Sequence, residues 1–429
     1  MKLVVRGGRV IDPSQDLDGV FEILIEDGLV TQVDEKVKGS RGAEVYEANG
    51  MVVSPGLIDM HVHLREPGQE YKETVRTGTL AAAAAGFTSV ACMPNTAPVI
   101  DNRSVTEHVM KEAREAGFAR VFPIGAVSKG QKGDELAEIG EMVTAGAVAI
   151  SDDGFPVSNA ELMRRALLYA QHYDIPVIQH AQDLDLSAGG VMNEGEWSTR
   201  LGLPGAPGSA EDVMVARDVL LSEDTGGRYH VAHLSTARSL DMIRRAKGQG
   251  LAVTCEVTPH HLVLTDEAVS ETGFSTNTKM NPPLRSERDR EALLNGLADG
   301  TIDAIASDHA PHHADEKDVE FSAAPFGVIG LETNLSICLD RLVRPGIISL
   351  NRLVELFTVG PARVLNLPVG TLRPGAPADL TVFHPKRPVT VRAKRFRSKA
   401  RNTPFEGWRL RGRPIATILG GRVLSRPKQ

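Results

Sequence analysis

Eight short apolar runs in the middle of the chain constrain its fold more than any other feature of the sequence. Each run has the composition of a strand buried on both faces, and stretches of helical composition lie between the runs. This alternation is typical of a parallel α/β sheet. Eight such strands predict a TIM-type (β/α)8 barrel, which we assign to residues 56–365. In chain order the runs are VVSPGLIDMHVH, TSVACMPN, RVFPIGAV, AVAISDD, PVIQHA, YHVAHLS, LAVTCEV and DAIASDHA.

The helical stretches carry their own end signals. The stretch at 73–86 contains the strong helix formers Ala81–Ala85, and Gly86 is placed to end the helix. A doubly wound open sheet is the structural alternative to the barrel. Its nucleotide-binding form is disfavoured, because no GxGxxG motif follows the first run.

The two ends of the chain have a similar sequence pattern, which differs from that of the middle. Short strand-like segments punctuated by Gly and Asp occupy residues 1–55, and similar segments return near the other terminus in ADLTVFHP, VTVRA and PIATILGGRVLS. Because sheet edges need pairing or protection, we expect the two ends to complete one another. The prediction is a small β-sandwich domain formed by residues 1–55 plus 366–429.

Composition and charge exclude several classes of protein. The net charge of -7 argues against nucleic-acid binding, and no stretch approaches the ~20 apolar residues of a membrane helix. The basic stretch at 392–401 lacks interleaved aromatic residues beyond Phe396, which favours a solvated face or a subunit contact. The scattered Cys92, Cys255 and Cys338 predict buried thiols in a reducing cytoplasm.

Histidine and aspartate residues end five of the eight runs. Because catalytic groups of a TIM barrel gather at the carboxyl ends of its strands, we expect these side chains to converge. His61 and His63 are two apart, so on a strand they face the same side. Imidazole and carboxylate ligands without cysteine suit Zn²⁺, and six ligands suit two ions that share a carboxylate. The six candidates are His61, His63, His180, His233, Asp308 and one of the neighbouring residues Asp152 and Asp153.

Longer motifs around these residues make the pattern specific. GLIDMHVHLREPG, at 56–68, resembles the opening signature of dihydroorotases and their close amidohydrolase relatives. AISDDG, VIQHAQD, VAHLS, KMNPPLR and ASDHAPH match later motifs of that family in order and spacing. The resemblance covers essentially the whole chain, and it implies a zinc-dependent amidohydrolase with a barrel and a two-ended β domain.

The resemblance implies two zinc ions per chain and a role for each ligand. Asp153 resembles the bridging ligand, at a place where many relatives use a carbamylated lysine. The choice of Asp153 over Asp152 rests on this match, since the chemistry of the SDD run leaves both open. Asp308 also resembles the catalytic acid/base that passes a proton to the leaving nitrogen. The implied ligands are His61, His63 and Asp308 for one ion, and His180 and His233 for the other.

The resemblance also implies which residues bind the substrate. Arg65 and Asn95 resemble a clamp on a substrate carboxylate, an anion that a guanidinium suits. Without the motif, a surface ion pair is the simpler interpretation of Arg65. The long segment at 310–325 is predicted to be a lid or binding loop. Further implied contacts are His63, Asn281, His312, Phe326 and Gly327.

Two neighbouring histidines are not assigned to the site. His260 and His261 follow the seventh run. Adjacent positions on a strand face opposite ways, so both cannot enter one site, and we predict a structural or supporting role for them.

The implied reaction is the reversible cyclisation of N-carbamoyl-L-aspartate to (S)-dihydroorotate and water, a step of pyrimidine biosynthesis. Arg65 and the SDD run favour it over a sister amidase acting on allantoin, hydantoins or dihydropyrimidines. A non-catalytic dihydroorotase-like subunit that scaffolds aspartate carbamoyltransferase is disfavoured, because all six ligand positions are filled. We expect a small-molecule substrate, a cytoplasmic homodimer, no nucleic-acid or membrane partner, and a complex with aspartate carbamoyltransferase as a further candidate.

Overall fold

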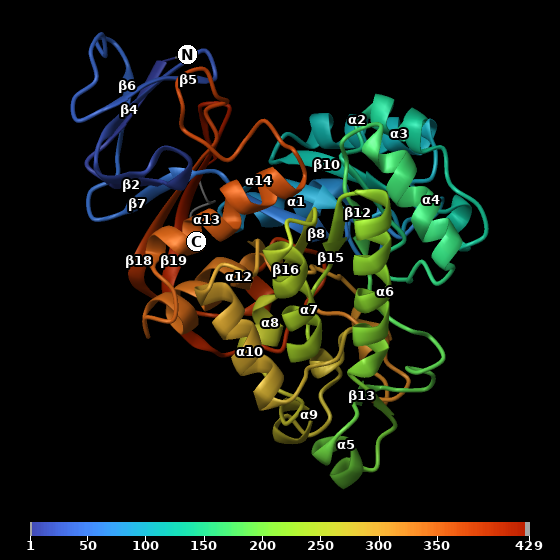
Figure 1. Ribbon diagram of the computed structural model, residues 1–429. Coiled ribbons are helices and arrows are strands. Elements are labelled where there is room, and N and C mark those ends of the chain that lie inside the picture. Colours follow the sequence, from blue (N-terminus) through green and yellow to red (C-terminus); the bar gives the residue numbers. More distant parts are fainter. Residues whose placement is uncertain (1, 425–429) are drawn as a thin grey trace.

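The computed structural model describes residues 2–424, and its centre is an eight-stranded sheet in which every neighbouring pair is parallel (Figure 1). A parallel bridge between Val62 and His309, with a His63 N–H to His309 O hydrogen bond of 2.8 Å, joins the first strand to the segment after the last. The sheet therefore closes, which confirms the TIM-type barrel. Its strands are β8 (Leu57–Val62), β9 (Phe87–Cys92), β10 (Arg120–Gly125), β11 (Ala149–Ser151), β12 (Val177–Gln179), β15 (Tyr229–Val231), β16 (Val253–Val257) and β17 (Ala304–Ile305).

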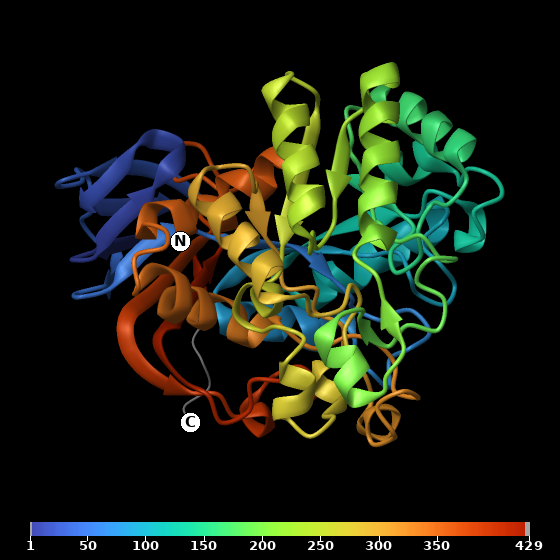
Figure 2. The ribbon, with the colours of Figure 1, turned by 60° about the horizontal axis from the view of Figure 1, so that its bottom comes forward.

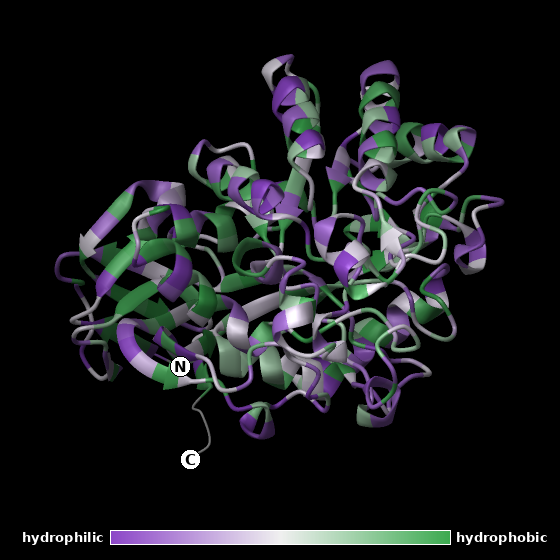
Figure 3. Cartoon of the chain, turned by 90° about the horizontal axis from the view of Figure 1, so that it is seen from below, coloured by the Kyte–Doolittle hydropathy of each residue, from purple (hydrophilic) through white to green (hydrophobic). Residues whose placement is uncertain are grey.

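Helices surround this sheet and connect its strands (Figures 1 and 2). In Figure 3 the outward-projecting helices carry both hydrophilic and hydrophobic residues, as helices with one buried face do. The longer helices are α1 (Val75–Ala85), α2 (Arg103–Ala116), α3 (Ile139–Ala145), α4 (Ala160–Gln171), α6 (Ser209–Thr225), α7 (Ala237–Gly248), α10 (Glu287–Ala298), α12 (Leu331–Cys338) and α13 (Leu350–Phe357). Shorter ones are α5 (Glu196–Leu201), α8 (Pro259–Val263), α9 (Ala268–Glu271), α11 (Ala314–Lys317) and α14 (Val359–Val364).

Helix α1 shows how the local sequence sets an element's limits. The Thr74 side chain accepts a hydrogen bond from the Thr77 N–H and caps the first turn, a contact worth about 1 kcal/mol. Gly86 adopts φ 98° and donates its N–H to the Ala82 and Ala83 carbonyls. A residue with a Cβ is strained at that φ, so the predicted helix stop at Gly86 is confirmed.

Segments from both ends of the chain build the remaining large sheets. A six-stranded sheet combines β2 (Arg9–Asp12), β3 (Leu17–Val20) and β7 (Val52–Pro55) with β18 (Leu380–Thr390), β19 (Arg409–Leu419) and β20 (Arg422–Leu424). A four-stranded sheet holds β1 (Lys2–Arg6), β4 (Glu22–Glu26), β5 (Leu29–Asp34) and β6 (Glu44–Glu47). One apolar cluster packs between them, and the blue and red ends lie together in Figure 1. The expected pairing of the two termini is confirmed, whereas the exact domain limits stay a prediction.

The first apolar run is not one strand, contrary to prediction. β7 pairs with β18 in the terminal sheet, and β8 pairs with β9 in the barrel. Gly56 separates the two strands, and a Cβ there would lie 2.0 Å from Thr88 Oγ1. Apolar composition cannot reveal such a change of sheet, because both halves of the run are buried.

Within the described chain, no helix is long and apolar enough to cross a membrane.

Candidate active site

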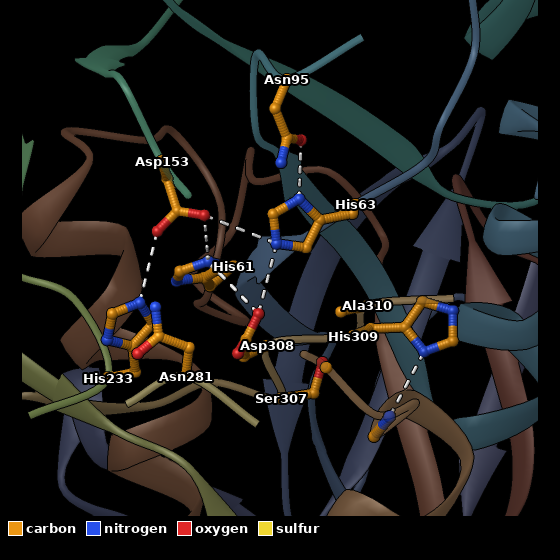
Figure 4. A network of polar contacts seen from close by, with 12 residues as sticks. His61, His63, Asn95, Asp153, His233, Asn281, Ser307, Asp308, His309 and Ala310 are labelled. Atoms are coloured by element: carbon orange, nitrogen blue, oxygen red, sulfur yellow. Dashed lines mark hydrogen bonds and ion pairs between the residues drawn. The ribbon is translucent and has the colours of Figure 1, made fainter. Parts of the chain in front are cut away.

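The predicted metal ligands meet at the carboxyl ends of the barrel strands. His61 belongs to β8, and the others stand one or two residues beyond β8, β11, β12 and β15 or three beyond β17. Each side chain is buried, with at most 6% of its residue surface exposed. Figure 4 shows the His61 and His63 rings turned toward Asp153 and Asp308.

Asp153 lies at the centre of this cluster and contacts four histidines. Its Oδ2 lies 3.5 Å from the Nε2 atoms of both His61 and His63. Its Oδ1 lies 3.3 Å from His180 Nδ1 and 3.3 Å from His233 Nε2. One carboxylate oxygen therefore faces each pair of histidines.

Asp152, the neighbour of Asp153, contacts backbone and hydroxyl groups instead of histidines. Its carboxylate accepts hydrogen bonds from the Val127 N–H at 2.8 Å, the Ser128 N–H at 3.0 Å and the Ser128 hydroxyl at 2.5 Å. These contacts hold the loop after β10, and they leave Asp152 outside the histidine cluster. Geometry thus separates two aspartates that the sequence leaves open.

The hydrogen bonds of His61 and His63 leave the Nε2 atom of each ring available to a bound cation. Asn95 Oδ1 lies 2.8 Å from His63 Nδ1, and Glu256 Oε1 lies 2.6 Å from His61 Nδ1. Both partners are oxygen acceptors, so each Nδ1 donates and, in the neutral ring, Nε2 presents a lone pair to the carboxylates. The buried His61 Nε2 makes no hydrogen bond within the described residues. A divalent cation between the lone pairs and the carboxylates would satisfy both.

The charge of the cluster agrees with this interpretation. Burial disfavours the His61 imidazolium, yet the carboxylates of Asp153 and Glu256 raise the pKa of His61 well above its ordinary value. A site that attracts a proton so strongly also attracts a metal cation. Ligand atoms within 4.8 Å of one another occur in two groups of three, His61, His63 and Asp308, and His61, Asp153 and His233. The nitrogen and oxygen donors, with no thiolate, suit Zn²⁺ and similar divalent ions.

Asp308 stands on the other side of the two β8 histidines. Its Oδ1 lies 3.2 Å from His63 Nε2 and 3.6 Å from His61 Nε2. Burial by itself would raise the pKa of Asp308, but the contact with His63 and the neighbouring imidazoles hold it below its usual range. Asp308 is therefore ionised near neutrality and can accept a proton.

Glu256 is a supporting residue that the sequence analysis missed. It lies on β16, is 1% exposed, and also places Oε2 3.6 Å from His230 Nε2. Despite burial, the contacts with His61 and His230 lower the pKa of Glu256 to about 2. Its carboxylate therefore fixes the orientation and tautomer of His61. The signal was present, because Glu256 is a carboxylate inside the apolar run LAVTCEV.

His260 and His261 lie on helix α8 rather than on a strand, so the predicted opposite orientation does not apply. His261 Nε2 lies 3.0 Å from Pro282 O, and its Nδ1 lies 2.7 Å from the Thr258 hydroxyl. These contacts give His261 the structural role that was expected. Burial lowers the pKa of His260 to about 4.

A cavity of about 230 Å³ opens beside the metal cluster and brings the predicted substrate residues together. Asn281 donates to Gln182 Oε1 at 2.8 Å, and His312 Nε2 donates to Phe326 O at 2.8 Å. The metal-side lining also includes Gly154, which was not predicted. The predicted substrate residues that line the cavity are His63, Arg65, Asn95, Asn281, His312, Phe326 and Gly327.

Arg65 brings a positive charge into this cavity without an acidic partner. The residue is 8% exposed, and its Nε donates to Pro311 O at 3.2 Å. Among residues 2–424 no carboxylate forms an ion pair with it, which argues against a surface ion pair. Burial lowers the pKa of Arg65 to about 10, so the guanidinium stays charged at neutral pH. Asp308, Glu316 and Asp153 act on this charge from a distance but form no ion pair with it, so the guanidinium can still bind an anionic ligand directly.

Comparisons with known proteins show the family to which the chain belongs. A family model described as "Dihydro-orotase-like" matches residues 50–239, and one described as "Amidohydrolase family" matches residues 212–425. The dihydroorotase of Citrifermentans bemidjiense is 54% identical over 424 residues, 99% of both chains. That of Acetivibrio thermocellus is 51% identical over 426 residues, again 99% of both chains. That of Anaeromyxobacter sp. strain K is 57% identical over 422 residues, 98% of this chain and 97% of its own.

Solved structures show the same architecture. The L-hydantoinase (dihydropyrimidinase) of Arthrobacter aurescens has a TM-score of 0.88 at 25% identity, covering 100% of this chain and 96% of its own. The dihydropyrimidinase of Brevibacillus agri NCHU1002 has a TM-score of 0.87 at 24% identity with the same coverage, which shows the shared fold alone.

Proposed function

This chain belongs to the dihydroorotase family of the amidohydrolases, hydrolases of cyclic amide bonds, and from its site we propose how its residues carry out that reaction. The activity is the reversible closure of N-carbamoyl-L-aspartate to (S)-dihydroorotate and water. The observation that carries the substrate assignment is the unpaired Arg65 guanidinium in the same cavity as the histidine–aspartate cluster. A ring carboxylate is the anion that this cation lacks.

We propose that two divalent cations, zinc in the cell, occupy the cluster. The first would be held by His61, His63 and Asp308, the second by His180 and His233, with Asp153 shared between them. The support is the contact of each Asp153 oxygen with a different pair of histidines. Such ions lower the pKa of a bound water and polarise the amide carbonyl.

In this proposal Asp308 moves the proton. In the hydrolytic direction its carboxylate takes a proton from the attacking water and returns it to the leaving ring nitrogen; in ring closure the same steps run backwards. Two features support this role: Asp308 lines the cavity, and its lowered pKa keeps it ionised before the reaction begins. Glu256 acts indirectly, by holding the His61 ring in place.

The substrate side of the cavity would orient the ring against this carboxylate. Arg65 and Asn95 bind the ring carboxylate, and Asn281 and His312 contact the ring from the opposite loops. Phe326 and Gly327 cover the bound ring. Supporting this assignment, all six residues line the one cavity that also contains Asp308.

The test is a side-by-side measurement of kcat/KM on dihydroorotate, dihydrouracil, hydantoin and allantoin with the zinc-loaded protein. Dihydroorotate should be turned over best, because it alone combines the six-membered ring with the carboxylate that Arg65 binds. A higher kcat/KM on a ring without a carboxylate would assign the chain to a sister amidase. Absence of turnover on all four would favour a non-catalytic subunit.

The remaining proposals concern the cell rather than the site. We propose a cytoplasmic homodimer, and a complex with aspartate carbamoyltransferase as a second assembly. The three cysteines are buried and unpaired, which suits a reducing compartment. Sedimentation of the purified chain, alone and with aspartate carbamoyltransferase, tests both assemblies.

A further inference from the structure

A second cavity, of about 440 Å³, lies apart from the candidate active site and shares no lining residue with it. It is lined by residues of α1, of α12 and of the hairpin formed by β18 and β19, and β19 packs against α12. The hairpin is the red arch in Figure 2. Four arginines line it, namely Arg392, Arg395, Arg397 and Arg413. Three of them belong to the basic stretch at 392–401, for which the catalytic reaction has no use.

The positive charge of this cavity is not neutralised by the residues that the structure describes. Arg392 pairs with Glu406, Nη1 to Oε1 at 3.3 Å. Arg397 makes its hydrogen bonds through its backbone N–H, and within residues 2–424 no hydrogen bond or ion pair is formed by the guanidinium groups of Arg395, Arg397 and Arg413. The Nε atom of Arg413 is buried and unpartnered in that range. Leaving a buried donor without a partner is unfavourable, so a ligand that accepts a hydrogen bond from Arg413 Nε would remove that cost.

The one acidic residue in the lining does not supply the missing anion. The Glu332 carboxylate accepts from the Arg397 N–H at 2.8 Å and the Ser398 N–H at 3.2 Å, so both contacts are to backbone. Burial raises the pKa of Glu332 to about 7, so its negative charge is only partly present at neutral pH. Burial and the nearby positive charge of Arg387 lower the pKa of Arg413. Because four arginines and only one partly ionised glutamate line the cavity, it keeps an excess of positive charge.

The remaining wall is partly apolar, with Ser336 and Thr390 as its polar members. Val389, Val391 and Phe396 line it beside the arginines. A guanidinium donates through a planar fork that matches an oxyanion with several oxygens, and an apolar wall accommodates the body of a small organic molecule. The cavity volume lies within the range of small-molecule sites.

We propose that this cavity is a binding site for a small oxyanion, a phosphate ester or a small dicarboxylate, held by Arg395, Arg397 and Arg413. Hydrogen bonds connect its wall to His309, the chain neighbour of the catalytic aspartate. Ser398 follows Arg397 and donates its hydroxyl to Glu73, whose Oε2 lies 3.4 Å from His309 Nε2. His309 adjoins Asp308 in the chain. An anion bound at Arg397 therefore contacts a segment that supports the active site.

The experiment is isothermal titration of the zinc-loaded protein with inorganic phosphate at low ionic strength. One site per chain with a dissociation constant of about 1 mM or tighter is expected. The double variant Arg397→Gln, Arg413→Gln should weaken binding at least about tenfold, because it removes two charge-assisted contacts. Succinate in place of phosphate separates the carboxylate source from the phosphate source.

Two control variants sharpen the result. Arg409→Gln removes an exposed arginine from the same strand β19 but outside the cavity, and should leave phosphate binding unchanged. Arg65→Met should also leave it unchanged, since Arg65 lines the other cavity. Thermal unfolding adds a second measurement: phosphate should raise the Tm of the wild type and not that of the double variant.

Three outcomes would overturn the proposal. One is the absence of binding by both phosphate and succinate. Another is equal weakening in Arg409→Gln and in the double variant, which would mean non-specific attraction to surface charge. The third is loss of phosphate binding in Arg65→Met alone, which would place the anion in the active-site cavity.

Discussion

The two halves of the candidate active site are built in different ways. The metal half consists of side chains at or just beyond the ends of barrel strands, all buried and in contact with one another. The substrate half lies on loops, and one of its members, Phe326, is 38% exposed. His63 belongs to both halves, and Asp308 of the metal half also lines the substrate cavity. In the proposed mechanism the barrel therefore supplies the catalytic groups, whereas the loops select the ring that is accepted.

The supports of the two halves also differ. Glu256, inside the barrel on β16, holds the His61 ring. Asn402 lies outside the barrel, between β18 and β19, and holds the substrate loops. Its Nδ2 donates to Ala310 O at 3.0 Å and Gly327 O at 3.1 Å, and its Oδ1 accepts the His312 N–H at 3.3 Å. We therefore expect changes in the metal half to impair every substrate, and changes in the substrate half to act selectively.

Removal of the metal should have the largest effect. Chelation is expected to abolish turnover of dihydroorotate and dihydrouracil alike, and Zn²⁺ should restore both. Elemental analysis of the active protein should find about two zinc ions per chain. Full activity with a reproducible single ion per chain would contradict the binuclear proposal.

Asp308→Asn should have the next largest effect. The amide preserves the shape of the side chain but cannot carry the proton, so kcat should fall by ~10²–10⁴ on both substrates. Metal content measured in the same preparation controls for loss of a ligand. A variant that retains its metal and turns over at a near wild-type rate would mean that another residue is the acid/base.

Arg65→Met tests the substrate half. Loss of the charge-assisted contact should cost ~2–4 kcal/mol in kcat/KM on dihydroorotate and nothing on dihydrouracil. Arg65→Lys should recover part of the loss, because an ammonium does not reproduce the planar fork. Equal losses on the two substrates would contradict the assignment of Arg65 as a carboxylate clamp. They would also mean that a change in the substrate half does not act selectively.

Glu256→Gln tests the support of the metal half. The substitution keeps the size of the side chain and removes the charge that orients His61, so metal affinity should fall about 10–100-fold. Competition with a chelator measures the affinity, and Glu271→Gln, an exposed glutamate on α9, is the matched control. After saturation with zinc, KM for dihydroorotate should return to the wild-type value. A persistent change in KM would mean that Glu256 also shapes the substrate half.

Asn402→Asp tests the support of the substrate half and should have the smallest effect. It keeps the acceptor for the His312 N–H but loses two donors and places a charge beside two carbonyls. KM for dihydroorotate should rise by about 5–30-fold, as expected for two weakened hydrogen bonds, with metal content unchanged and kcat little altered. Asn402→Ser, which is too short to reach the loops, should behave alike. If KM stays at the wild-type value in both variants, the loops are supported by other contacts.

The barrel could be predicted because its evidence is local. All eight apolar runs contain strands, since a strand buried on both faces leaves a continuous apolar signal. Histidines and aspartates at the ends of such runs are conspicuous, because polar side chains are rarely buried without a ligand or a hydrogen-bonding partner. The two-residue spacing of His61 and His63 at the end of β8 also indicated that both side chains face the same side.

Other features depend on residues far apart in the chain. Asp152 and Asp153 are chemically identical neighbours, and only the folded loop after β10 shows which carboxylate is already engaged. Glu256 meets His61 across 195 positions, and no local pattern reports that contact. The division of the first run at Gly56 follows from the approach of Thr88, which lies on the next strand.

The sequence by itself therefore determined the barrel, the pairing of the two termini and the set of histidine and aspartate side chains that meet at the strand ends. Periodicity, composition and the positions of polar residues at strand ends were sufficient for these. The tertiary structure alone decided which aspartate faces all four histidines, that Arg65 is buried without an acid in the described chain, and that Asn402 supports the substrate loops. Each of these depends on distances between segments that are joined through the fold and not through the chain.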